Sequence, residues 1–270
     1  MMHLLKLEFK KFKNYRPFII MAVLYMVLLP LTLLITKNFP EESRVQEMFG
    51  IQGFYTFPNI WKFLAYSGNW IVFFFLGFMG VLSITNEFSN KTLRQNIITG
   101  MSRREYFLGK ITFVGAVSLA ATLVYFLTGF FIGFYHSYSF ELNDLAGNAN
   151  YYFRYFLMCF GYMSFGLFLG TLFRRTGIAI FVFLAYGVFV EVILRGLHVY
   201  FFGKTRTSLF YPLNAMEDLA PIPFKDLMEE LINDWGFELF LSGNEAVITS
   251  SIFISLFLFG VYRILTKKDL

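Results

Sequence analysis

Long apolar runs separated by short polar segments dominate the chain. A helix needs about 20 apolar residues to cross about 30 Å of hydrocarbon. Six runs reach or nearly reach this length, at residues 17–36, 60–85, 111–135, 152–173, 177–197 and 246–265. The pattern predicts an all-α integral membrane protein, in which residues 1–270 form a single transmembrane domain with six transmembrane helices.

Two boundaries within this pattern carry their own predictions. Ser67, Gly68 and Asn69 interrupt the second apolar run early, so we expect the deep part of the span to begin near Trp70. The fourth and fifth runs are separated only by residues 174–176, which predicts a tight hairpin.

The distribution of Lys and Arg predicts the orientation of the chain. If the N-terminus is cytoplasmic, most of the 23 Lys and Arg residues fall in cytoplasmic segments, and few of the 18 Asp and Glu residues do. Basic residues are enriched in cytoplasmic loops of membrane proteins. We therefore expect both termini in the cytoplasm, and a multi-pass protein of the inner (cytoplasmic) membrane.

Residues 1–16 combine apolar and basic positions at helical spacing. The apolar positions, Leu4, Leu5, Phe9, Phe12 and Tyr15, fall on one arc of a helix, and lysines occupy another. This pattern is typical of an amphipathic helix that lies in the membrane interface. The alternative is a disordered basic tail that only sets the topology.

The loop at residues 86–110 contains an apolar stripe among polar residues. Leu93, Ile97 and Ile98 predict a short half-apolar helix that Gly100 ends. Ser102 and Glu105 have the spacing of a capping box, which would start the helix leading into the third span. No span lies beside this stripe along the chain, so we expect another surface to cover it.

The segment at residues 198–245 holds a second amphipathic pattern, on the outer side of the membrane. Its apolar positions include Phe224, Leu227, Leu231 and Trp235, and its polar face is mostly acidic. Helices that lie on lipid usually have a basic polar face. We therefore expect this helix to pack on the outer mouth of the protein.

Composition and motifs narrow the functional classes. Apolar residues make up 57% and charged residues 15%, against roughly 25% charged in globular chains, and the net charge of +5 suits anionic lipid head groups better than nucleic acid. Gly203-Lys204-Thr205 resembles the end of a phosphate loop, but His198 stands where that motif needs glycine. The chain shows no nucleotide, metal or catalytic motif, so we expect no enzymatic activity and no cofactor in it.

One carboxylate lies deep in the fifth run. Glu191 is followed one turn later by Arg195. An ionisable residue inside a membrane indicates a functional site by default, which here would be a polar contact along a transport path. The alternative is an ion pair near the outer interface. The sequence leaves both open.

The loop after the second span carries a resemblance to a known family. Glu87-Phe88 closes the span, Thr92-Leu93-Arg94 follows, Arg103 lies in the next turn, and Gly109-Lys110 opens the third span. This series resembles the type-2 ABC exporter permeases, and about 25 positions carry the match.

The resemblance implies a particular assembly. The chain would pair with a second permease copy or a paralogue, and would bind cytoplasmic ABC ATPase subunits that hold ATP and Mg²⁺. A coupling helix would dock on the ATPase, and the outer helix would gate the path. The coupling positions are Thr92, Leu93, Arg94, Ile97 and Ile98.

Two other functions remain open. A stand-alone secondary transporter needs coupling-ion ligands near the membrane midplane, often on broken helices, and Glu191 is the only deep carboxylate in the runs. A membrane anchor linked to an ABC ATPase would transmit force without transport. Substrate flux and its dependence on sodium or protons distinguish these functions.

Overall fold

The computed structural model describes residues 2–35, 54–137, 145, 148–203, 205–220, 222–223 and 240–267. In these residues the secondary structure is helical, and six helices are long and apolar enough to cross a membrane. They are α2 (Arg16–Ile35), α4 with η2 and α5 (Asn59–Ser89), α7 (Arg103–His136), α9 (Ala149–Phe173), α10 with η3 and α11 (Thr176–Phe202), and α14 (Gly243–Lys267). The predicted all-α fold with six spanning helices is therefore confirmed.

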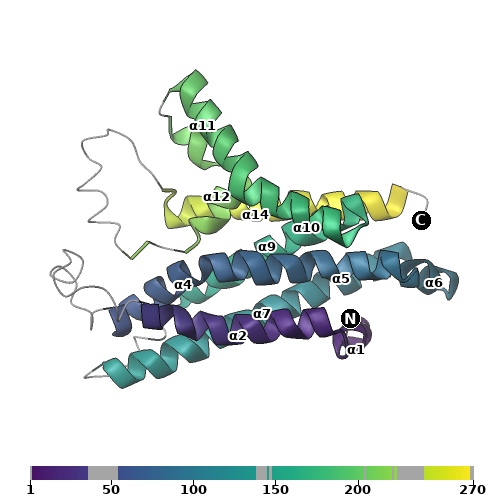
Figure 1. Ribbon diagram of the computed structural model, residues 1–270, viewed down its shortest axis with the longest axis horizontal. Coiled ribbons are helices and arrows are strands. Elements are labelled where there is room, and N and C mark those ends of the chain that lie inside the picture. The colour runs from purple at the N-terminus through teal and green to yellow at the C-terminus, as the bar shows by residue number, and fades with distance from the viewer. Residues whose placement is uncertain are drawn as a thin grey trace.

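Shorter helices lie at the two ends of the bundle (Figure 1). At one end, called the α6 end, are α1 (Met2–Phe12), α6 (Thr92–Ile98) and the C-terminal end of α14. At the other, called the α12 end, are η4 (Arg206–Leu209), α12 (Pro212–Glu217) and the first turns of α4, α9 and α14. The two termini lie at the same end, as an even number of spans requires. That the α6 end faces the cytoplasm remains a prediction from the basic residues.

The second span is a continuous helix through residues 67–69, and the expected start of its deep part near Trp70 stays a prediction. α4 (Asn59–Ile71) runs into the π-helical turn η2 (Val72–Leu76) and then α5 (Gly77–Ser89). Polar groups in this stretch find partners inside the bundle: Asn69 Oδ1 accepts a hydrogen bond from Tyr162 at 2.9 Å, and the Ser67 hydroxyl lies 3.0 Å from that of Thr32. Because neighbouring helices satisfy these groups, the backbone stays helical.

Glycines allow α5 and α9 to approach closely. A Cβ atom added at Gly80 would lie 3.0 Å from the carbonyl carbon of Met163, and one added at Gly166 would lie 3.2 Å from that of Gly77. Small residues at such crossings let helix backbones make van der Waals contact. The four-residue spacing of Gly166 and Gly170 therefore reflects packing within the bundle.

Aromatic side chains fill the core between α2, α4, α7 and α9. Tyr125 and Tyr155 stack with ring centroids 4.0 Å apart, and the Tyr125 hydroxyl donates to the Trp61 carbonyl at 2.7 Å. The Tyr25 hydroxyl donates to the Ala121 carbonyl at 3.0 Å. These tyrosines combine large apolar area with a satisfied polar tip, which accounts for part of the chain's high aromatic content.

The predicted hairpin between the fourth and fifth spans is present. α9 ends at Arg174, which has a φ of +58°, and α10 (Thr176–Ala185) starts two residues later. The Thr176 hydroxyl donates to that of Thr85 on α5 at 2.9 Å, and the Arg174 guanidinium lies 5.3 Å from the ring centre of Phe88. These contacts fix the turn against the end of the second span.

Candidate functional site

The short helix α6 lies at the junction between the second and third spans. It follows Lys91, which has a φ of +56°, and the chain turns again at Gly100, where φ is +105°. Left-handed backbone of this kind favours glycine. The predicted short helix ending at Gly100 is therefore confirmed. So is the capping box at the start of α7, in which Ser102 and Glu105 bond each other's backbone N–H groups.

The apolar side chains of α6 do not form one exposed stripe. Leu93 is only 3% exposed, Ile97 packs partly buried against the core, and Ile98 is 75% exposed. The expectation that the chain itself covers none of these residues is wrong for Leu93, because α6 folds back onto α5. Arg94 is exposed. The free face of α6 therefore combines Ile98 with polar and basic groups.

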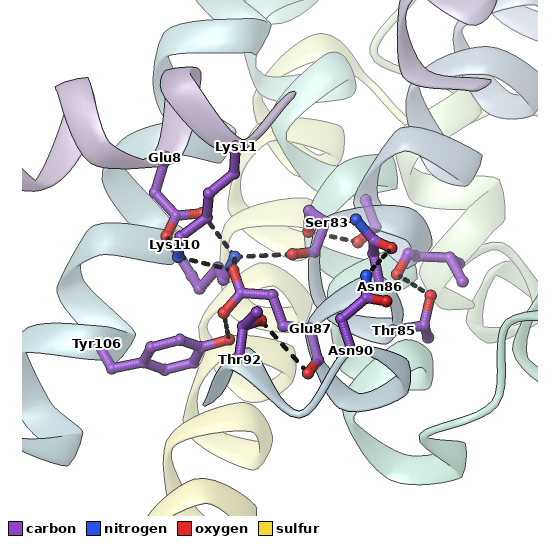
Figure 2. Close-up of polar contacts among 12 residues, drawn as sticks. Glu8, Lys11, Ser83, Thr85, Asn86, Glu87, Asn90, Thr92, Tyr106 and Lys110 are labelled. Atoms are coloured by element: carbon purple, nitrogen blue, oxygen red, sulfur yellow. Dashed lines mark hydrogen bonds and ion pairs between the residues drawn. The ribbon is translucent and has the colours of Figure 1, made fainter. Parts of the chain in front are cut away.

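A buried cluster of charged side chains lies beside Thr92, the first residue of α6 (Figure 2). The Lys110 ammonium group from α7 lies 2.6 Å from the Glu8 carboxylate of α1, and also binds Glu87 of α5. Lys11 of α1 lies 2.6 Å from Glu8 and 2.9 Å from Glu87. Two lysines and two glutamates thus form one network, called here the Glu8–Lys110 cluster.

The cluster is neutral and well bonded. Lys110 also donates to the Ser83 carbonyl at 2.7 Å, and the Tyr106 hydroxyl donates to Glu87 at 3.0 Å. Burial lowers the pKa of Lys11, but the carboxylates of Glu87 and Glu8 outweigh it and raise the pKa above its ordinary value. Lys11 is therefore charged at neutral pH. A buried ion network of this kind is sensitive to loss of any partner.

The cluster joins three helices to α6. Glu87 binds α1 through Lys11 and α7 through Lys110 and Tyr106. Its backbone carbonyl also faces the hydroxyl of Thr92, the first residue of α6, at 3.5 Å. A displacement of α6 would thus act on α1, α5 and α7 through neighbouring contacts.

The sequence showed the members of the cluster but not their contacts. Glu87 and Lys110 stood out only as loop residues, and Glu8 was not singled out. One signal was available, because Glu8 lies four residues before the buried Phe12 and so faces the same side of α1. Glu87 and Lys110 also stand at the facing ends of consecutive spans, at similar depth.

The other loop positions have structural contacts. Arg103 donates to the carbonyls of Leu265 and Thr266, both at 3.0 Å, and so binds the C-terminal end of α14. Gly109 lies beside α1, where a Cβ atom would be 3.7 Å from that of Leu4. Arg103 and Gly109 therefore place the start of α7, which follows α6, against α14 and α1.

Glu191 binds backbone groups of α12, a contact that neither expectation included. Its carboxylate is buried and accepts the backbone N–H groups of Leu213 at 3.0 Å and Asn214 at 2.6 Å, at the start of α12. The charge of Arg195 also acts on this carboxylate, and the ion pair and the path contact both stay predictions. Glu191 and Arg195 both line a cavity of about 50 Å³, which has room for only one or two water molecules.

The outer gate helix predicted at Phe224, Leu227, Leu231 and Trp235 lies outside the described residues. Its packing on the outer mouth therefore stays a prediction.

Comparison with known protein families matches residues 4–190 to the family described as ABC-2 family transporter protein. The matched range contains α1 from Leu4 onward, the first four spans, α6 and every residue of the Glu8–Lys110 cluster. Among curated proteins, none matches the chain.

Proposed function

Because the chain belongs to the ABC-2 family of transporter proteins, we propose that it is the permease subunit of an ATP-driven exporter. It spans the membrane several times, and in this proposal it works in the inner membrane. A second permease copy or paralogue completes the translocation path. ATP and Mg²⁺ bind in separate cytoplasmic ATPase subunits.

The observation that carries this proposal is the placement of α6. The second span leads into this seven-residue helix, and the third span follows it. On the helix, Ile98 and Arg94 are exposed, whereas Leu93 is buried. Arginine is enriched at the hot spots of protein interfaces, and the resemblance to type-2 ABC exporter permeases implies a coupling helix in this loop. We assign the Ile98 face of α6 as the ATPase-docking surface, with Arg94 available to an acidic rim on the partner.

The Glu8–Lys110 cluster gives this docking surface a route into the bundle. When ATP draws two ATPase subunits together, each would move the α6 helix on which it docks. Glu87 contacts the start of α6 and also binds side chains of α1 and α7. The motion would therefore shift these helices as a unit, and open a path between the two permeases.

Ile98→Asp is the direct test of docking. Its side chain is 75% exposed, so the substitution leaves the fold intact but places a carboxylate in an apolar contact. We expect the ATPase subunit to be lost on co-purification, or ATP hydrolysis to be uncoupled from transport. Ile97→Asp is less informative, because Ile97 packs against the core and the change would also destabilise the bundle.

His3→Asp is the matched control, since it adds the same carboxylate to an exposed position of α1 at the same end. It should co-purify with the ATPase as the wild-type chain does. Loss of the ATPase in His3→Asp, with normal behaviour of Ile98→Asp, would move docking to α1.

Reconstitution tests the class of function. The purified chain alone should neither hydrolyse ATP nor transport. Full transport without a partner would instead indicate a secondary transporter. An ATPase partner whose hydrolysis is coupled to the chain, with no flux of any compound, would indicate a force-transmitting anchor.

A further inference from the structure

The α12 end of the bundle contains a cavity with two cationic side chains. Residues of α4, α9, the chain that follows α12 and the start of α14 line it, and its volume is about 240 Å³. Lys62 from α4 and Arg154 from α9 line it, together with Asp218, Tyr151 and Ser242. This cavity lies at the opposite end of the bundle from α6, and it takes no part in the proposed coupling.

Arg154 is held in place but is not fully bonded. It is only 7% exposed, and its Nη2 atom donates to the Asp218 carbonyl at 2.7 Å. Its Nε atom is buried and has no hydrogen-bond partner. Gly243 makes room for the guanidinium group, since a Cβ atom there would lie 2.9 Å from Nη1. A buried donor without an acceptor is unfavourable, so the site is one acceptor short.

The acidic residue of the cavity does not neutralise the two cations. The Asp218 carboxylate accepts hydrogen bonds from the Leu241 N–H at 2.9 Å and from the Asn214 amide at 3.1 Å. Among the described residues, no carboxylate lies within 4.0 Å of the Arg154 guanidinium or the Lys62 ammonium group. Even when Asp218 is ionised, two cations against one anion leave an excess of one positive charge, in a partly enclosed space.

We propose that this cavity binds a phosphate group, with Arg154 Nε–H and the Lys62 ammonium as its charged donors. Guanidinium and ammonium groups form short, charge-assisted hydrogen bonds to phosphate oxygens. The volume corresponds to roughly eight water molecules at about 30 Å³ each. It therefore has room for a free phosphate or a phospholipid head group. The proposal is independent of the ATPase partner.

Inorganic phosphate is the first probe, added to the full-length chain in neutral detergent. A ligand that binds only the folded state raises the thermal midpoint Tm, and the stabilisation grows with ligand concentration as RT ln(1 + [L]/Kd). Phosphate should raise the Tm relative to chloride at equal ionic strength, which keeps charge screening constant. Lys62→Gln and Arg154→Gln should each weaken the apparent Kd about tenfold, the loss expected for one charge-assisted bond.

Arg206→Gln is the control for phosphate binding. It removes the same charge from a side chain that binds Glu245 in the first turn of α14 but does not line the cavity, and it should leave the apparent Kd unchanged. Lys62→Gln keeps the test valid if Arg154→Gln fails to fold, because Lys62 is only half-buried.

Lipid is the second arm. The chain is reconstituted in nanodiscs of phosphatidylcholine, with or without phosphatidylglycerol, and native mass spectrometry records retained phospholipid. Retention by the wild-type chain and its loss in Lys62→Gln would assign the site to a head group, even without an effect of free phosphate. Two results would overturn the proposal: no phosphate shift together with no retained lipid, or equal effects in Lys62→Gln and Arg206→Gln.

Discussion

The ammonium group of Lys110 on α7 lies 2.6 Å from the carboxylate of Glu8 on α1, although 102 positions separate them in the chain (Figure 2). The Lys110 side chain is fully buried, whereas that of Lys11, which binds the same carboxylate, is 28% exposed. Helix α1 is thereby fixed to the bundle by a buried charge as well as by its apolar face.

Lys110→Met should strongly destabilise the protein. The change leaves Glu8 and Glu87 buried with one cation in place of two, and removing one partner of a buried ion pair costs about 3–5 kcal/mol. Lys11→Met is the matched comparison, and should cost less because water reaches that side chain. The measurement is the Tm of each variant in detergent. Equal Tm values for the two variants would contradict the central role of Lys110.

The crossing of α5 and α9 should not tolerate a methyl group. Gly166→Ala places a Cβ atom against the backbone of Gly77 and 3.0 Å from the Val81 nitrogen, and overpacking of this kind costs roughly 1–3 kcal/mol. Gly196→Ala on α11 is the control, since nothing lies within 4 Å of the added atom. A lower Tm for Gly166→Ala alone is the expected result; unchanged Tm for both would mean that the helices are further apart.

Asp218 should make stability depend on pH. Burial is the main cause that raises the pKa of Asp218 from 3.8 to about 7, and the charge of Glu217 adds to it. The hydrogen bond from Leu241 and the charge of Arg195 act in the opposite direction. The folded protein therefore keeps this proton at pH values where the unfolded chain has lost it. Its contribution to stability is complete below pH 3.8 and is lost as the pH rises through about 7.

Asp218→Asn separates this effect from other titrations. Asparagine keeps an oxygen that can accept the Leu241 N–H, and it carries no charge. The Tm of the wild-type chain should fall more steeply than that of Asp218→Asn as the pH is raised to about 7. Parallel pH profiles for the two proteins would show that Asp218 titrates normally.

Thiol labelling can establish the orientation of the bundle. Ser102 and Thr207 are exposed at opposite ends, and the native Cys159 is fully buried. In intact cells, a membrane-impermeant reagent should label Thr207→Cys and not Ser102→Cys, whereas permeabilised cells should show both. The reverse pattern in intact cells would place the α6 end outside.

The sequence determined the parts of this protein that depend on neighbouring residues. Six spans followed from apolar runs, because the thickness of the hydrocarbon sets the length of a spanning helix. The capping box at Ser102 and Glu105, the short helix ended by Gly100 and the hairpin at Arg174 followed from local hydrogen bonding and backbone conformation. These features involve contacts across a few residues, which one sequence displays directly.

Only the tertiary structure decided which polar and apolar groups meet across the bundle. Leu93 is buried because α6 folds back onto α5, and the second span stays helical at Asn69 because Tyr162 on another helix bonds to it. Glu191 lies opposite two backbone N–H groups more than 20 positions away. Such partners depend on how helices cross and rotate. Many distant side chains set that geometry together, and apolar periodicity alone does not encode it.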